Sequence, residues 1–369
     1  MTQKTRKWIL FGAGGFVVYF FVAAQPVPVE AVVSPKWFIS LESNYPVAES
    51  EGDEALVDMP RLLPFQLGNR FGYVTPDGKC TVNRIKKGEL SISVDNWAEY
   101  DPAPKEIEVR NALDQPILKI LEDQGYPVFL DKRIFLVSPE LNSLSGVDAE
   151  GAVQWTHDFA ATLTTIDAAA GFIVAGLLDG TVELLDNQGQ RVFFFEPGGS
   201  RISVIQGCAI SQDGLRLAVI SGIDLQRFLL LERYGGYGDS GNIEYKVVYH
   251  EFLEEGFRRP VYMEFVDNDN RVAFERQGGL GIYEIHSRTG LKVPLEGEII
   301  RLDESGSEHW LFLITAQEAQ KKRLVAVRFP GTLIIEAPFT SRTFFLGRQG
   351  SQIYVGGNMT LASFELEKQ

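Results

Sequence analysis

The stretch Ser-Gly-Val-Asp-Ala-Glu-Gly-Ala-Val-Gln-Trp, residues 145–155, predicts a strand that ends at Asp148, a tight turn at Glu150-Gly151 and a second strand that reaches Trp155. A similar stretch follows at residues 182–193. Three positions of the first stretch recur 38 residues later in the second. They are Asp148 and Asp186, Gly151 and Gly189, and Trp155 and Phe193. A strand–turn–strand unit with a period near 40 residues indicates the blades of a β-propeller. We therefore expect an all-β fold in which these positions are structural.

Short strands separated by turn signals continue through residues 66–369, and we expect them to form a seven-bladed β-propeller, with six or eight blades as the alternatives. The last blade shows only three evident strands, at residues 343–346, 352–355 and 361–366. A ring that closes needs a fourth strand there, because an unpaired sheet edge recruits other chains. Residues 37–41 or 71–74 are the candidates for that strand.

The N-terminus predicts export. Residues 1–7 are polar and basic, and residues 8–24 are uncharged and rich in aromatic side chains. As a helix this segment would span about 26 Å, slightly less than a hydrocarbon core of about 30 Å. Residues 1–24 are thus either a signal-anchor or a signal peptide cleaved near Ala24, and in both cases the basic flank stays in the cytoplasm. The rest of the chain is then extracytoplasmic, on the periplasmic side.

Residues 25–65 have the composition of a tether, with six of the chain's 17 prolines and an acidic cluster at residues 49–58. Proline and acidic residues favour an extended segment that does not pack into a core.

Charge and cysteine content exclude several classes of function. The net charge of −14 argues against nucleic acid as a partner, because that affinity depends on Lys and Arg that neutralise phosphates. The two cysteines, Cys80 and Cys208, lie far apart and belong to no Cys/His cluster, so we expect no metal site or redox motif. Whether they form a disulfide is left open by the sequence.

Residues 148–155 resemble the outer hairpin of PQQ-like and WD40-like propeller repeats, in which an Asp, a Thr-Gly turn and a Trp recur. Residues 286–291 are similar to another copy, with the Thr-Gly retained. The resemblance implies two kinds of relative, quinone-dependent dehydrogenases and non-catalytic scaffolds of envelope complexes. The enzymes hold their quinone with adjacent cysteines, which this chain lacks. The resemblance therefore implies a scaffold without a cofactor.

One long loop is a candidate for partner binding. Residues 233–242 interrupt the repeat and are rich in Gly and Tyr. The Gly-Asp-Ser-Gly at 238–241 resembles the nucleophile turn of serine proteases, but the four histidines are scattered and none occurs in that family's His motif. Tyrosine offers a large contact area with a polar tip, so the loop favours recognition through Tyr234, Tyr237 and Asp239.

We thus expect a membrane-tethered propeller that acts as a non-catalytic protein-interaction scaffold in an envelope complex, with protein partners and no catalytic, metal or cofactor residues. The alternative is an enzyme or small-ligand sensor that uses the central funnel. Convergent charged groups in a closed pocket would favour the alternative.

Overall fold

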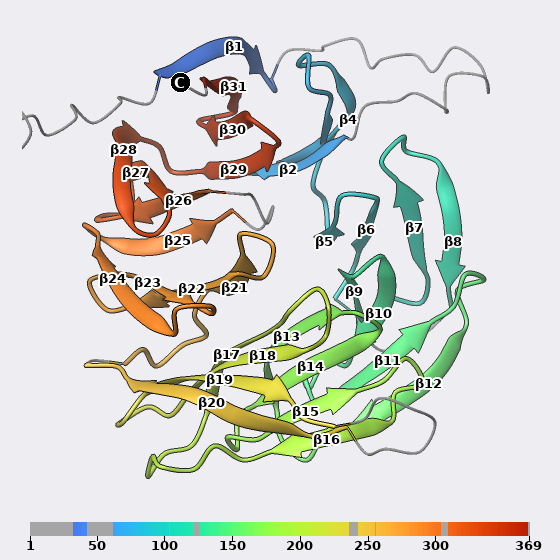
Figure 1. The fold of residues 1–369 in the computed structure, drawn as a ribbon. Coiled ribbons are helices and arrows are strands. Elements are labelled where there is room, and N and C mark those ends of the chain that lie inside the picture. The colour runs from blue at the N-terminus through green and yellow to red at the C-terminus, as the bar shows by residue number, and fades with distance from the viewer. Residues whose placement is uncertain are drawn as a thin grey trace, which may run out of the picture.

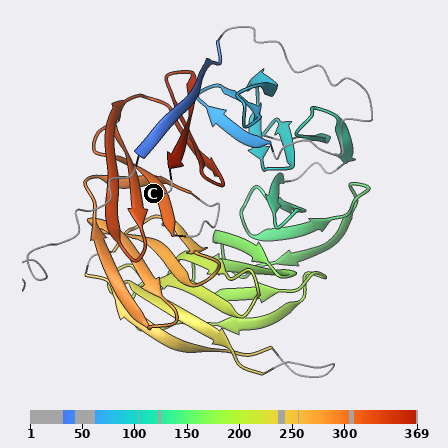
Figure 2. The ribbon, with the colours of Figure 1, turned by 45° about the horizontal axis from the view of Figure 1, so that its top comes forward.

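The chain is arranged as eight antiparallel β-sheets around a ring. The structure, a computed structural model, describes residues 32–42, 62–102, 104–121, 125–235, 243–254, 256–303 and 309–367. These residues form strands β1 to β31. The sheets follow one another around a central axis in chain order, as the colour sequence shows in Figures 1 and 2. The fold is an eight-bladed β-propeller, and we number the blades one to eight from β2 onward.

Blades one to four come from residues 63–195, and the strands of each follow one another outward from the axis. Blade one is β2 (Leu63–Leu67), β3 (Arg70–Val74) and β4 (Cys80–Ile85). Blade two is β5 (Glu89–Ile92), β6 (Asn96–Tyr100), β7 (Ile107–Asn111) and β8 (Pro116–Ile120). Blade three is β9 (Tyr126–Leu130), β10 (Arg133–Val137), β11 (Ser143–Val147) and β12 (Val153–Asp158). Blade four is β13 (Leu163–Ala169), β14 (Phe172–Leu177), β15 (Val182–Leu185) and β16 (Arg191–Phe195).

Blades five to eight complete the ring. Blade five is β17 (Ile205–Ile210), β18 (Arg216–Ser221), β19 (Arg227–Arg233) and β20 (Tyr245–Phe252). Blade six is β21 (Met263–Val266), β22 (Arg271–Arg276), β23 (Gly279–Glu284) and β24 (Thr289–Pro294). Blade seven is β25 (Glu298–Leu302), β26 (Trp310–Ala316), β27 (Lys321–Arg328) and β28 (Thr332–Thr340). Blade eight is β29 (Phe344–Gln349), β30 (Gln352–Gly357), β31 (Thr360–Glu367) and β1 (Val32–Ser40).

The burial of each strand follows from its place in the blade. The second strand of a blade has neighbouring blades on both faces, and β14 is accordingly apolar and buried after its first residue. The outermost strand borders solvent, and β12 alternates between half-buried and exposed positions. Apolar side chains join adjacent blades, as where Phe228 of blade five stacks on Phe274 of blade six with ring centroids 4.5 Å apart. The core is therefore a series of clusters between blades.

The prediction of seven blades is wrong, because the described residues form eight sheets, of which residues 63–120 contribute two, β2–β4 and β5–β8. Blade one has three strands among the described residues, and its innermost strand β2 contains Pro64, which weakens the strand signal. The first strand of blade two, β5, has only four residues. Short strands without clear alternation do not reveal from sequence which neighbours share a sheet.

The strand that closes the ring comes from residues far from the last blade in sequence. Strand β1 pairs antiparallel with β31, and Trp37 lies opposite Ser363. The indole Nε1 of Trp37 also donates a hydrogen bond to the carbonyl oxygen of Pro76 in blade one, at 2.8 Å. Of the two candidates for this strand, residues 37–40 lie in β1 and complete the last blade, whereas residues 71–74 lie in β3 of blade one.

The N-terminal segments are described only in part. The predicted signal-anchor or signal peptide at residues 1–24 lies outside the described residues. Within the predicted tether, the structure describes residues 32–42 and 62–65, which belong to or adjoin blades eight and one. Among the described residues, we find no helix with the length and hydropathy to span a bilayer.

Both cysteines are buried free thiols. Cys80 packs in the cluster between blades one and eight, and Cys208 packs in the cluster between blades four and five. Burial raises the pKa of the Cys80 thiol to about 11 and that of Cys208 to about 12. The two cysteines therefore act as small apolar core residues.

Candidate functional site

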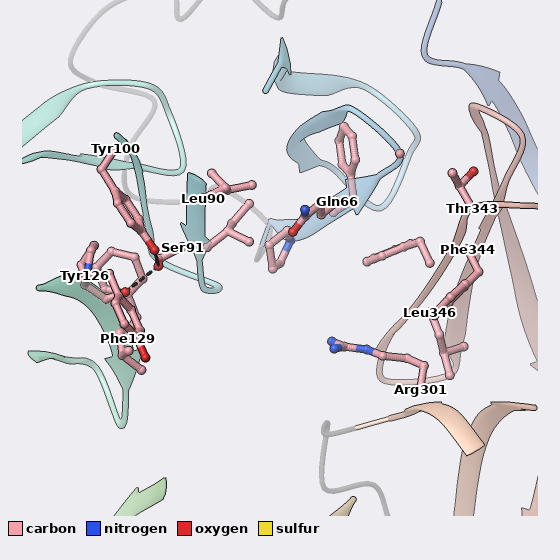
Figure 3. A pocket seen from close by; sticks show the side chains of 17 residues that line it. Gln66, Leu90, Ser91, Tyr100, Tyr126, Phe129, Arg301, Thr343, Phe344 and Leu346 are labelled. Atoms are coloured by element: carbon pink, nitrogen blue, oxygen red, sulfur yellow. Dashed lines mark hydrogen bonds between the residues drawn. The ribbon is translucent and has the colours of Figure 1, made fainter. Parts of the chain in front are cut away.

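The innermost strands surround a channel that contains two adjoining cavities. The first has a volume of about 770 Å³ and lies against β2, β5, β9, β25 and β29. Its lining is mostly apolar and aromatic, as with Phe65, Leu90, Tyr126, Phe129 and Phe344. Figure 3 shows Arg301 extending from β25 into this cavity, opposite Tyr100 and Ser91. The first cavity is therefore lined mainly by hydrophobic residues, yet polar groups as well as apolar ones face into it, and Arg301 lies at its edge.

The second cavity, of about 540 Å³, lies against the ends of the innermost strands and is charged. It shares Arg301 with the first cavity. Its lining includes four carboxylates and a second arginine, namely Asp167, Glu264, Asp269, Asp303 and Arg348. Convergent charges in a closed pocket would favour an enzyme or a small-ligand sensor.

Three of these carboxylates bind the neighbouring blade. Asp167 of blade four accepts a hydrogen bond from the backbone N–H of Ile210 in blade five at 2.9 Å. Asp269 of blade six accepts one from the N–H of Gln212, also in blade five, at 2.7 Å. The charges at this end of the channel thus bridge adjacent blades, which is a structural role.

The third carboxylate, Asp303 of blade seven, pairs with Arg348 of blade eight at 3.7 Å, and both side chains are buried. Arg348 also donates hydrogen bonds to the carbonyl oxygens of Gly350 at 2.8 Å and Trp310 at 3.1 Å. Burial lowers the pKa of the Arg348 guanidinium, and the charge of Asp303 opposes that shift. The charge of Asp303 therefore helps to keep the buried Arg348 guanidinium in its charged form.

Partial burial raises the pKa of the Asp269 carboxyl. Nevertheless, the acidic groups do not assemble into a metal site. Across the described ranges no group of three or more His, Cys, Asp or Glu is arranged to hold a metal ion. Asp167, Asp269 and Asp303 thus bond to backbone or side-chain groups of neighbouring blades.

The repeat positions from the sequence lie at the outer hairpins, away from the channel. Asp148 Oδ1 accepts hydrogen bonds from the N–H groups of Glu150 and Ala152, at 3.0 and 2.8 Å, and Asp186 holds its own turn in the same way. Gly151 and Gly189 adopt φ values of 89° and 72°. These are left-handed conformations that favour glycine.

Trp155 joins blades three and four at these hairpins. Its Nε1 donates to the carbonyl oxygen of Asn187 at 2.9 Å, and its ring lies so close to Gly189 that a Cβ there would overlap it. Phe193, the counterpart of Trp155, packs on Tyr245 of blade five with ring centroids 5.1 Å apart. The aromatic repeat position thus contacts the next blade in both copies.

Two further hairpins have the same construction. Thr75 and Asn111 occupy the place of Asp148, and each side chain accepts a backbone N–H four residues later, from Lys79 at 2.9 Å and from Gln115 at 3.0 Å. The spacings of these positions, 36 from 75 to 111 and 37 from 111 to 148, are a signal in the sequence. Thr and Asn replace Asp while keeping the acceptor, which hides the repeat from a search for identical residues.

The structure describes part of the predicted recognition loop. Tyr234 is 60% exposed, and the Nζ of Lys246 lies 4.4 Å from the centre of its ring. Tyr237 and Asp239 lie outside the described residues. Tyr234 follows the third strand of blade five, so it lies on the same side of the ring as the hairpins of the repeat.

The opposite side of the ring carries an exposed apolar surface that no pattern in the sequence predicts. Chain direction alternates along a blade, so the turns between second and third strands lie on the same side as the connections between blades. Four large side chains on this side of blades four and five are 51–54% exposed, namely Leu178, Ile202, Leu225 and Phe252. We call this surface the Leu178 patch.

Backbone and side-chain contacts hold the Leu178 patch together. The N–H of Ile223 donates to the carbonyl oxygen of Ile202 at 3.2 Å, which joins the connection between the blades to a turn of blade five. Arg227 donates to the carbonyl oxygen of Pro197 at 2.8 Å, and its guanidinium lies 5.5 Å from the centre of the Phe252 ring. The turn that carries Leu178 lies against the same connection between the blades, since a Cβ added at Gly180 would lie 2.3 Å from Ser203 Cβ, so the four side chains come from segments that contact one another.

The chain matches, over residues 1–369, the model of a family described as beta-propeller protein. A protein of Treponema pallidum (strain Nichols), described as uncharacterized, is 26% identical over 369 residues, which are 99% of this chain and 95% of that protein.

Among solved structures, BamB from Moraxella catarrhalis aligns with a TM-score of 0.57 at 12% identity, over 92% of this chain and 99% of BamB. A chain in the crystal structure of the mitotic checkpoint complex aligns with a TM-score of 0.54 at 11% identity, over 94% of this chain and 96% of that chain. At such low identity these likenesses show the fold alone.

Proposed function

Because the chain belongs to the beta-propeller protein family along its whole length, we propose that it is a non-catalytic protein-interaction scaffold whose rigid blades present a docking surface. The fold of the chain resembles that of BamB and that of a chain in the mitotic checkpoint complex. Rigid repeats that hold loops at fixed positions suit partner binding.

The observation that carries the proposal is the Leu178 patch. Its four side chains are each about half exposed, and they come from consecutive turns and connections of two blades. Exposed apolar side chains that gather on one surface mark interaction sites, whereas single ones scattered over a surface do not. In contrast, three of the channel carboxylates are already bonded to neighbouring blades. The cavity of about 770 Å³ favours a second candidate, a small-ligand sensor.

We expect that replacing Leu178, Ile202 and Leu225 together by Asp reduces partner capture at least tenfold, about 1.4 kcal/mol of binding free energy. Three carboxylates in place of apolar contacts would have to be desolvated in the complex. The measurement is crosslinking and pull-down from intact envelopes with residues 1–24 retained.

The matched control replaces three side chains of similar exposure on outermost strands, Ile117, Phe194 and Leu291, which are 44–47% exposed. Capture should survive these substitutions. Equal capture by the patch variant and the control variant would contradict the proposal. So would co-purification of a small metabolite alone, which would instead support the sensor.

We further propose that the scaffold works outside the cytoplasm, in an envelope complex, tethered by residues 8–24 or released after cleavage near Ala24. The support is the basic flank at Lys4, Arg6 and Lys7 before an uncharged stretch. A reporter that is active only outside the cytoplasm, fused after Gln369, is expected to be active. An inactive reporter on a stable fusion would refute export.

A further inference from the structure

The three strands of blade one correspond to the second, third and fourth strands of the other blades. The indole of Trp155 in blade three donates to the carbonyl oxygen of Asn187, in the hairpin between the third and fourth strands of blade four. The indole of Trp37 in blade eight makes the same contact with Pro76, in the hairpin between β3 and β4. A Cβ at Gly78 in this hairpin would also overlap the Trp37 ring. Strands β3 and β4 are therefore the third and fourth strands of blade one, and β2 is its second.

The first strands of neighbouring blades run parallel to each other, as blades four and five show. Thr164, near the start of β13, donates to the carbonyl oxygen of Ile205 at the start of β17. Asp167, further along β13, accepts a hydrogen bond from the N–H of Ile210 at the end of β17. A first strand in blade one would accordingly run parallel to β29, the first strand of blade eight.

Strand β2 runs antiparallel to β29 instead. A Cβ added at Gly68, just after the end of β2, would lie 3.3 Å from Thr343, just before β29 begins. A Cβ added at Gly347, further along β29, would lie 3.1 Å from Leu63 at the start of β2. This is the direction of a second strand. Among the described residues, blade one therefore has no first strand.

The inner edge of β2 faces the channel and can accept a strand. Leu67 pairs with Arg70 across a two-residue turn, and the residues that flank such a turn bond to each other. Backbone groups alternate in direction along a strand, so those of Gln66 and Pro64 point away from β3. Because Pro64 has no N–H, the edge offers the N–H and C=O of Gln66 and the C=O of Pro64. Both residues line the first cavity.

The chain passes from one side of the ring to the other just before β2. The N–H of Leu41 donates to the carbonyl oxygen of Met359, in the turn between the second and third strands of blade eight. That turn lies on the side of the Leu178 patch, where first strands begin. Leu62 lines the second cavity, on the side where first strands end. Residues 43–61 thus connect the two sides in the direction of a first strand.

The sequence near the end of this segment resembles that of the observed first strands. Strands β9, β21 and β25 end in Leu or Val followed directly by Asp, at residues 130–131, 266–267 and 302–303. Residues 54–58, Glu-Ala-Leu-Val-Asp, end in the same way, shortly before Pro60 and the start of β2. A segment of this length suffices, because the first strand of blade two, β5, has only four residues.

We propose that residues 54–58 form the first strand of blade one and pair antiparallel with the inner edge of β2. Their main chain bonds to the N–H and C=O of Gln66, and Leu56 and Val57 pack between blades eight and two. This assignment goes beyond the scaffold role and does not depend on the Leu178 patch. It gives part of the channel to the chain itself, which leaves less room for a ligand in the first cavity.

Hydrogen exchange at the Gln66 amide of the full chain tests the pairing. We expect this amide to exchange more slowly than in the unfolded chain by about tenfold or more, as amides paired in a sheet do. The variant L56D/V57D should remove this protection. The matched control V47D/A48D adds the same charge to the same segment and should leave it unchanged. The amide of Val219, in the centre of blade five, should stay protected in both variants, which shows that the ring remains folded.

Fast exchange of the Gln66 amide in the unaltered chain would overturn the proposal, because the inner edge of β2 would then be open to water. Slow exchange that L56D/V57D leaves unchanged would overturn it too, since another group would then cover the edge. Should L56D/V57D also lose the protection of Val219, the milder variant L56G/V57G replaces it and is judged by the same outcomes, because glycine weakens a strand without burying a charge.

Discussion

Replacing Asp303 by Ala is expected to destabilise the propeller by about 3–5 kcal/mol, because it leaves the buried guanidinium of Arg348 without its counter-charge. Arg348 would keep its bonds to the carbonyl oxygens of Gly350 and Trp310. Those dipoles do not neutralise a full charge in a poorly solvated place. The measurement is the midpoint of thermal or urea unfolding.

The double variant Asp303→Leu/Arg348→Met tests the reason. Apolar side chains of similar volume can replace a buried ion pair at little cost, so the double variant should be more stable than Asp303→Ala alone. Lys321→Ala, at the exposed pair with Glu318, should leave the midpoint unchanged because exposed ion pairs contribute little. If Asp303→Ala unfolds at the wild-type midpoint, the channel charges do not hold the blades together and a ligand role for them gains support.

Replacing Gly189 by Ala is expected to cost about 3 kcal/mol. The left-handed backbone at φ 72° contributes about 1–2 kcal/mol for any residue with a Cβ. The overlap of that Cβ with the ring of Trp155 adds about 1–3 kcal/mol, as overpacking does in a core. Unfolding by urea, followed by Trp fluorescence, measures the sum.

Gly198 provides the matched control for the overlap. Its φ of 62° is also left-handed, but no atom lies within 4 Å of the position where a Cβ would be added. Gly198→Ala should therefore show only the backbone cost, and the difference between the two variants isolates the contact with Trp155. Equal losses for both variants would mean that the Trp155 contact does not join blades three and four.

The local units of this propeller could be predicted because each is encoded within a few residues. The hairpins at Asp148 and Asp186 depend on a side-chain acceptor, a left-handed glycine and two flanking strands. These are short-range requirements, so they leave a pattern with a fixed period. The strand β1 could also be anticipated, since a three-stranded last blade requires a partner and residues 37–41 have strand propensity.

The number of blades could not be predicted from such local patterns. Assigning β2–β4 and β5–β8 to two sheets depends on which strands pair, and that is decided by contacts between residues distant in sequence. Turns that use Thr75 or Asn111 in place of Asp keep the geometry and lose the identity, so the first two copies of the repeat are hidden.

The predicted site was also incomplete. Tyr234 is exposed, and its role in recognition stays a prediction. However, Leu178, Ile202 and Leu225 come from three separate segments that meet only on the folded surface, and no local pattern distinguishes them from core residues. The charged channel residues are likewise far apart in sequence, and their partners, such as Arg348 for Asp303, follow from the closure of the ring.

By itself, the amino-acid sequence determined that this chain is an all-β propeller built from a repeated hairpin, since backbone turns and alternating strands are local chemistry. Only the tertiary structure decided that there are eight blades, that the first has three strands among the described residues, and that an apolar patch lies on blades four and five. These features depend on how segments that are distant in the chain pair and pack. Such contacts leave no local pattern in the sequence.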